Sequence, residues 1–294
     1  MGNLVLLQGL QEVYRSNTAT SLLLRLKTSI GIGAAIAQNL ASKGCSLVLG
    51  YTSATSSKLA RDLASDLREK YDIAAVPAQA DIGSENGGNH VVAIAKEHFK
   101  ASQDNGFQID IVVNNAGIAE LKPLGEINLD LFNRIYKPNV LGPIFLLQAC
   151  LPYLPTDRSG RIVNVSSVGC ALGLREQTVY AGSKGALEAM TRVWARELAE
   201  RATVNSVNPG PVLSDIYKAT PDDIKHLLGQ WNQVSPLATV RSQDKAELQE
   251  WIKYGGRPAL ASEVAGVVAM LCTPDAAWTT GSLISANGGM RFSY

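Results

Sequence analysis

The chain has 294 residues, of which 46% are hydrophobic and 18% charged, and its formal net charge is +1. A chain of this length and composition can bury a large core in one α/β domain or in two smaller ones. A net charge this close to zero provides no basic surface for DNA, RNA or an anionic membrane, so we expect neither nucleic acid nor a membrane as a partner.

The cysteines, the histidines and the first residues exclude further classes of protein. The four cysteines form no CxxC pair and the three histidines have no metal-ligand spacing, so we expect no disulfide framework and no protein-bound catalytic metal. No apolar run is long enough to cross a membrane, and the first residues lack the basic segment and cleavage site of a secretion signal. We therefore expect a cytoplasmic protein.

From about residue 31 onward, short β-branched runs alternate with longer amphipathic segments. Their periods predict helices over residues 31–42, 56–70, 91–99, 129–154, 180–201 and 262–271. They predict strands over residues 46–50, 74–80, 109–113, 161–165, 203–207 and 282–286. This alternation is typical of a doubly wound parallel sheet, a Rossmann-like α/β fold with helices on both faces, and no flexible linker divides residues 1–294 into more than one domain. Ligands of such folds bind beyond the carboxyl ends of the strands.

Residues 211–258 depart from this alternation. They have little strand character and contain two predicted short helices, over residues 221–231 and 242–254. A long segment between a strand end and a helix often forms a lid over a site, so we expect a substrate lid here. An insertion that serves oligomer contacts is nearly as compatible with the sequence.

Tyr180 and Lys184 are the first candidates for chemistry. They lie four positions apart on a predicted helix, so the phenol and the ammonium share one face. A nearby cation favours the phenolate, and we expect it to lower the pKa of the tyrosine. Such a tyrosine can give a proton to a carbonyl oxygen or take one from an alcohol. Taken alone, however, a pair of this kind is more often a solvated helix face.

Three further features favour a reactive site. Ser167 follows the predicted strand 161–165, which places a hydroxyl at the carboxyl edge of the sheet. The small residues 114–117 end another strand, where a flat cofactor can lie against the backbone. Asn139 follows Pro138 inside a predicted helix, and the proline removes a backbone donor and frees carbonyls to bind water.

With these motifs in this order, the sequence resembles the short-chain dehydrogenase/reductase family of the Ser-Tyr-Lys-Asn type over about residues 28–291. It is especially similar to 3-oxoacyl-carrier-protein reductases and fungal ketoreductases. The resemblance implies that Tyr180 is the general acid/base and that Lys184 lowers its pKa and holds the nicotinamide ribose. It also implies that Ser167 polarises the substrate oxygen and that Asn139 anchors a proton-relay water.

The same resemblance implies a set of cofactor-binding residues around the strand ends. They are Gly31, Ile32, Gly33, Tyr51, Asp81, Ile82, Asn115, Ala116, Gly117, Tyr180, Lys184, Pro209, Gly210 and Val212. The family also commonly forms homo-oligomers, so a tetramer or dimer is expected.

Residues 1–27 are atypical of the family. Gly31 and Gly33 match its glycine-rich turn, but Lys27 stands where the first glycine of that turn is expected. Either residues 21–26 replace the first strand, or residues 4–9 form it and an insertion follows.

The end of the second predicted strand bears on the choice of cofactor. Residues 50–53 carry no carboxylate that would bind a ribose 2′-hydroxyl, which favours NADP(H) over NAD(H). We therefore expect NADPH-dependent reduction of a ketone to an alcohol, or the reverse, with a small carbonyl or alcohol compound as substrate. The alternative is a reductase fold that binds dinucleotide poorly or not at all and acts as a non-catalytic binding or scaffold protein.

Overall fold

A parallel β-sheet forms the centre of the computed structural model, which describes residues 21–25, 31–99, 106–218 and 222–292. The strand order is β3-β2-β1-β4-β5-β6-β9, and all six neighbouring pairs are parallel. The strands are β1 Ser21–Arg25, β2 Ser46–Tyr51, β3 Ala75–Gln79, β4 Ile111–Asn114, β5 Gly160–Val165, β6 Ala202–Pro209 and β9 Leu283–Ala286. This confirms the doubly wound parallel sheet that the alternation predicts.

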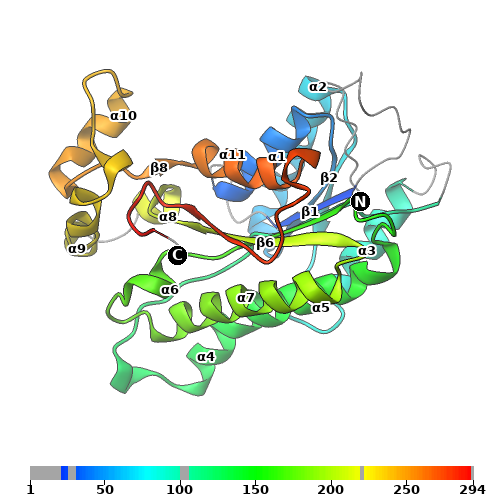
Figure 1. The fold of residues 1–294 in the computed structure, drawn as a ribbon, viewed down its shortest axis with the longest axis horizontal. Helices are drawn as coiled ribbons and strands as arrows, with labels where there is room; N and C mark the ends of the chain where they lie inside the picture. The colour runs from blue at the N-terminus through cyan, green and yellow to red at the C-terminus, as the bar shows by residue number, and fades with distance from the viewer. Residues whose placement is uncertain (1–20, 26–30, 100–105, 219–221, 293–294) are drawn as a thin grey trace.

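Helices cover both faces of this sheet (Figure 1). One face carries α1 Ile32–Ala41, α2 Ser57–Tyr71 and α11 Ala261–Leu271, and the other carries α3 Gly87–Phe99, α5 Gly142–Cys150 and α7 Thr178–Glu197. Every residue of β4, β5 and β6 is buried. Because both sides of these strands face helices, two separate hydrophobic clusters form the core, one on each face of the sheet.

The sequence left open which residues form the first strand. Strand β1 pairs in parallel with β2 over residues 21–25 and with β4 over residues 22–24. Of the two interpretations, the one that places the first strand in residues 21–26 is therefore supported, over the described residues 21–25. Residues 4–9 and Lys27 lie outside the described residues.

The long helix predicted over residues 129–154 is interrupted. Helix α4, Leu129–Tyr136, is followed by the π-helical segment η5, Lys137–Leu141, then by α5 and a 3₁₀ turn at Leu151–Tyr153. Pro138 has no N–H to continue the α-helical ladder, and the wider π turn accommodates it. This break brings Asn139 to the inside of the molecule, where the residue is 0% exposed.

The described residues 211–218 and 222–258 form a small unit at one side of the sheet (Figure 1). The unit contains α8 Asp215–Lys218, α9 Asp222–Gln233, α10 Ala246–Gln249 and η8 Glu250–Tyr254. It begins at β7, Val212–Leu213, which pairs in parallel with β8, Ala259–Leu260. Its buried cluster consists of Leu213, Tyr217, Leu248, Trp251 and Tyr254.

Candidate active site

A cavity of about 520 Å³ lies at the carboxyl ends of β2, β4 and β5. Its wall includes the first residues of α1 and two side chains of α7, those of Tyr180 and Lys184. The lining residues are Gly31, Ile32, Gly33, Thr52, Ser53, Ser56, Asn115, Ala116, Gly117, Ile118, Ala119, Pro138, Val165, Ser166, Tyr180, Lys184 and Ser214. The cavity is therefore where a doubly wound fold binds its ligands.

Lys184 is held at the inner wall of this cavity. Its side chain is buried, and its Nζ donates a hydrogen bond to the carbonyl oxygen of Val165 over 2.7 Å. Burial lowers the pKa of this ammonium from its ordinary value of 10.5 to about 8, because a charged group loses its hydration there. The lysine therefore remains mostly protonated at neutral pH.

The pKa of Tyr180 is raised above its ordinary value, so the expectation that a nearby cation would lower it was wrong. Burial is the largest cause, and a hydrogen bond with Ser167 acts in the opposite direction. Lys184 is not among the causes of this shift, and its ammonium donates to the Val165 carbonyl. At neutral pH Tyr180 keeps its proton.

Asn139 connects three parts of the site through its side-chain amide. Its Oδ1 accepts from the backbone N–H of Ile118 at 2.9 Å, and its Nδ2 donates to the Ile118 carbonyl at 3.0 Å and to Ser183 Oγ at 2.9 Å. Ser183 in turn donates to the carbonyl of Tyr180. The amide thus ties the loop after β4 to the helix that carries Tyr180 and Lys184.

Gly117 explains why that loop can approach so closely. A Cβ at this position would lie 3.0 Å from Lys184 Nζ and 3.4 Å from Asn139 Oδ1. A side chain here would compete with the lysine ammonium for space. Glycine therefore lets the strand-end loop, the lysine and the asparagine meet at one point.

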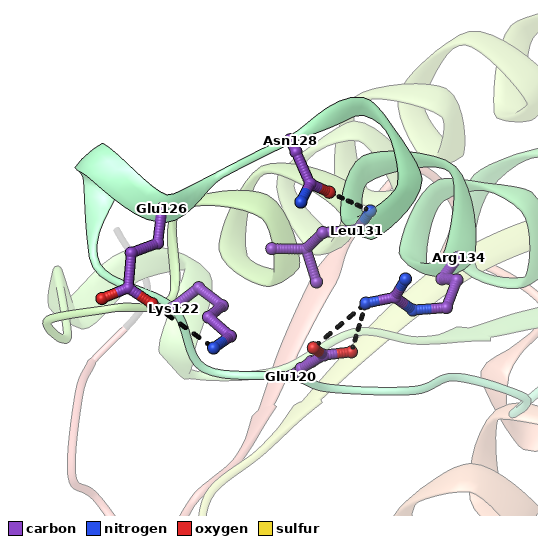
Figure 2. Close-up of polar contacts among 6 residues, drawn as sticks. All are labelled: Glu120, Lys122, Glu126, Asn128, Leu131 and Arg134. Carbon is purple, nitrogen blue, oxygen red and sulfur yellow. Dashed lines mark hydrogen bonds and ion pairs between the residues drawn. The ribbon is translucent and has the colours of Figure 1, made fainter.

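The rest of the loop after β4 is fixed by polar contacts (Figure 2). Glu120 accepts two hydrogen bonds from Arg134 Nη2, at 3.1 and 3.2 Å, while Lys122 pairs with Glu126 at 3.4 Å. Asn128 caps helix α4 by accepting from the backbone N–H of Leu131 over 2.9 Å.

The same loop also touches the segment that precedes α7. The Lys122 backbone N–H donates to the Glu176 carbonyl over 2.9 Å. The loop after β4 therefore contacts the chain just before the helix that carries Tyr180.

Ser167 lies just after β5, as predicted. Its Oγ accepts a hydrogen bond from the backbone N–H of Gly169 at 3.1 Å. A Cβ at Gly169 would lie 3.3 Å from that hydroxyl, so the turn packs tightly around it. Tyr180 is hydrogen-bonded with Ser167 and is linked to Asn139 through Ser183, while Lys184 is held by the Val165 carbonyl. Of these four residues, Tyr180 and Lys184 are part of the wall of the large cavity.

The predicted cofactor-binding residues are distributed over several places. Eight of them line the large cavity: Gly31, Ile32, Gly33, Asn115, Ala116, Gly117, Tyr180 and Lys184. Tyr51 and Ile82 line a smaller adjoining cavity of about 30 Å³, whose wall also includes Asn115 and Ala116. Asp81 is exposed, and its carboxylate accepts from the backbone N–H of Gly83 at 3.1 Å.

The predicted residues after β6 do not lie in the wall of the large cavity. Gly210 lines a separate cavity of about 260 Å³, while Pro209 and Val212 are buried in β6 and β7. From this part of the chain, Ser214 reaches the large cavity. Contacts of Pro209, Gly210 and Val212 with a cofactor stay predictions.

Sequence reasoning missed several residues of the cavity wall. Ser56, Ser166 and Ser214 are part of that wall, and Val165 holds the lysine through its backbone carbonyl. Only the position of Ser166, directly after a strand, gives a signal that could have been used. A backbone carbonyl as the partner of Lys184 has no sequence signal at all.

The donor set of the cavity fits a nicotinamide dinucleotide. The N-terminus of α1 presents backbone N–H groups that suit a pyrophosphate, Asn115–Gly117 offer a flat backbone surface, and Lys184 supplies a cation beside Tyr180. Among the described residues, no group of three or more His, Cys, Asp or Glu side chains could hold a metal ion. No helix in the described part of the chain is long and apolar enough to cross a membrane. Fold and site together define an oxidoreductase that uses a nicotinamide dinucleotide.

Comparison with known proteins agrees with this class. The family model described as short chain dehydrogenase matches residues 28–225. The chain is 46% identical to an L-xylulose reductase of Aspergillus niger, over 90% of this chain and 95% of that protein. It is 44% identical to an L-xylo-3-hexulose reductase of Hypocrea jecorina, over 90% and 94% of the two chains.

A solved structure gives the same result. A blue fluorescent protein from a metagenomic library, in complex with NADPH, is 31% identical, with a TM-score of 0.78 over 94% of this chain and 99% of that one. The chain belongs to the short-chain dehydrogenase/reductase family, the family that its sequence motifs resemble.

Proposed function

We propose that this protein reduces a polyhydroxylated ketone to the corresponding alcohol with NADPH. The observation that carries the proposal is that Tyr180 and Lys184 line a cavity whose donors suit a dinucleotide. Ser167 is hydrogen-bonded with Tyr180, and Asn139 is linked to Tyr180 through Ser183. The relatives named for L-xylulose and L-xylo-3-hexulose reduction support a ketose as the substrate class.

In this proposal the residues divide the proton chemistry among themselves. Bound NADPH supplies the hydride. Tyr180, protonated at neutral pH, gives its proton to the carbonyl oxygen as that oxygen becomes negative. The Lys184 ammonium stabilises the phenolate left behind, and Ser167 donates a hydrogen bond to the same substrate oxygen. Asn139 holds the Tyr180 helix against the loop that follows β4.

The end of β2 supports NADPH over NADH. Thr52, Ser53 and Ser56 line the cavity there with hydroxyl groups and no carboxylate. Ser53 Oγ lies 2.9 Å from both Thr55 Oγ1 and Ser56 Oγ, so these hydroxyls form one cluster. Such a cluster can donate to a ribose 2′-phosphate, whereas an acidic residue would repel it.

Residues 211–258 serve as the substrate lid in this proposal. Ser214, near their start, already contributes to the cavity wall. We also propose a homo-oligomer, which is supported by apolar side chains on outward helix faces. Phe132 on α4 is 39% exposed, and Val193 on α7 is 53% exposed.

The direct test is turnover of L-xylulose by the purified chain with NADPH and, separately, with NADH, followed by nicotinamide absorbance and product analysis. We expect reduction with both cofactors and a higher kcat/KM with NADPH. Failure to bind either dinucleotide at millimolar concentration would instead support the scaffold alternative. Turnover of simple ketones but of no ketose would contradict the proposed substrate class.

The rate of reduction should fall as the pH rises through about 8, the pKa to which burial lowers Lys184. Reduction needs the protonated lysine and the protonated tyrosine, and the lysine is the first of the two to lose its proton. The measurement is the pH profile of kcat/KM for ketose reduction at saturating NADPH. A profile that stays flat through this range would contradict the role given to Lys184.

A further inference from the structure

Glu188 lies beside the active site and was not among the predicted site residues. It is half-buried on α7, four positions after Lys184 and eight after Tyr180. A half-buried carboxylate loses hydration, so its hydrogen bonds indicate what it does. Both hydrogen bonds described for Glu188 come from the segment that carries Ser167.

The two contacts of Glu188 flank Ser167 on the chain. Ser166 Oγ donates to Glu188 Oε1 over 2.7 Å, and Cys170 Sγ lies 3.0 Å from the same oxygen. Cys170 Sγ also lies 3.0 Å from the carbonyl oxygen of Ser167. A single carboxylate oxygen therefore holds both ends of the turn 166–170.

That turn fixes the hydroxyl of Ser167. The N–H of Gly169, inside the turn, donates to Ser167 Oγ over 3.1 Å. On the other side, Ser166 Oγ also lies 3.3 Å from the carbonyl oxygen of Lys184, one helical turn before Glu188. Glu188 thus connects the segment of the serine to the helix of the tyrosine and the lysine.

We propose that Glu188 is a positioning residue that sets the place of the Ser167 hydroxyl relative to Tyr180. The inference rests on the proposed ketose reduction and deepens it. Hydrogen bonds to an ionised acceptor are shorter and stronger than those to a neutral one, so a carboxylate fixes the turn more firmly than an amide would. A misplacement of about 1 Å in a catalytic group can cost on the order of 10²-fold in rate.

The experiment compares Glu188→Leu, Ser167→Ala and the double variant with the wild type, with L-xylulose and NADPH. Glu188→Leu removes the acceptor, and we expect kcat to fall about 10- to 100-fold with KM changed less than about threefold. In the Ser167→Ala background the same change should cost less than about threefold, because Glu188 then has no hydroxyl to position. Glu188→Gln keeps an acceptor oxygen, so we expect this variant to retain most of the wild-type activity.

Glu197→Leu is the matched control, since Glu197 is exposed at the end of the same helix, and its kinetics should equal those of the wild type. If Glu188→Leu does not fold, Glu188→Asp replaces it, because the shorter carboxylate cannot reach both partners. Equal losses from the Glu188 change with and without Ser167 would overturn the inference. A wild type that reduces no ketose would refute the proposed function instead.

Discussion

Replacing Tyr180 by phenylalanine is expected to lower kcat for ketose reduction by about 10²- to 10⁴-fold, the range that general acid catalysis contributes. The change removes one oxygen and leaves the ring in place. The carbonyl oxygen then has to take its proton from water. The contacts of Lys184 with Val165 and of Asn139 with Ser183 involve other atoms, so they remain.

The measurement is steady-state turnover of L-xylulose with NADPH, together with cofactor binding and thermal unfolding of the variant. Binding and the unfolding midpoint should stay close to those of the wild type. Tyr153→Phe is the matched control, because Tyr153 is not part of the cavity wall, packs its ring edge to face against Phe107, and has only a long 3.5 Å hydrogen bond described for its hydroxyl, from Lys96. A Tyr180→Phe enzyme with wild-type turnover would disprove the assignment of the proton donor.

Asn139→Ala is expected to lower the free energy of unfolding by about 3 kcal/mol as well as the activity. Asn139 is fully buried, and its amide makes three hydrogen bonds, to the two backbone groups of Ile118 and to Ser183. Alanine leaves the two backbone groups of the half-buried Ile118 and the hydroxyl of the buried Ser183 without this partner, and each buried group left unsatisfied costs about 1–3 kcal/mol. Ser183 and the Ile118 loop then lose their link, so the Tyr180 helix is less well held.

Denaturant unfolding of Asn139→Ala beside Asn89→Ala checks this expectation. Asn89 is exposed on α3, and its replacement should change stability by less than about 0.5 kcal/mol. If both variants unfold at the same denaturant concentration, the amide of Asn139 contributes nothing to holding the site together. Kinetics of the folded variant then separate loss of activity from loss of fold.

Much of the fold could be predicted because the sheet is parallel and buried on both faces. Such strands are short β-branched runs, and the helices between them have an amphipathic period, so the alternation alone predicts a doubly wound parallel sheet, though not the order of its strands. The break at Pro138 was harder to place. A proline predicts a kink, but it does not predict a π-helical turn over Lys137–Leu141 or the contact of Asn139 with the Ile118 loop.

The sequence predicted which residues lie in the site better than it predicted their contacts and protonation. The spacing of Tyr180 and Lys184 puts them on one helix face, yet it does not show that the ammonium donates to the Val165 carbonyl. Burial of Tyr180 decides the direction of its pKa, and the spacing does not show that burial. Glu188 was overlooked because an acidic residue four positions from a lysine is ordinarily a solvent-exposed helix pair.

The way in which residues 211–258 are joined to the rest of the chain bears on how such enzymes diversify. The segment leaves the body at β7 and returns beside it at β8, with Val212 opposite Ala259, and it has a hydrophobic cluster of its own. Insertions or exchanges between these two strands therefore need not displace the helix of Tyr180 and Lys184. We expect descendants of one ancestral reductase to acquire new ketone preferences here while inheriting the proton-transfer residues unchanged.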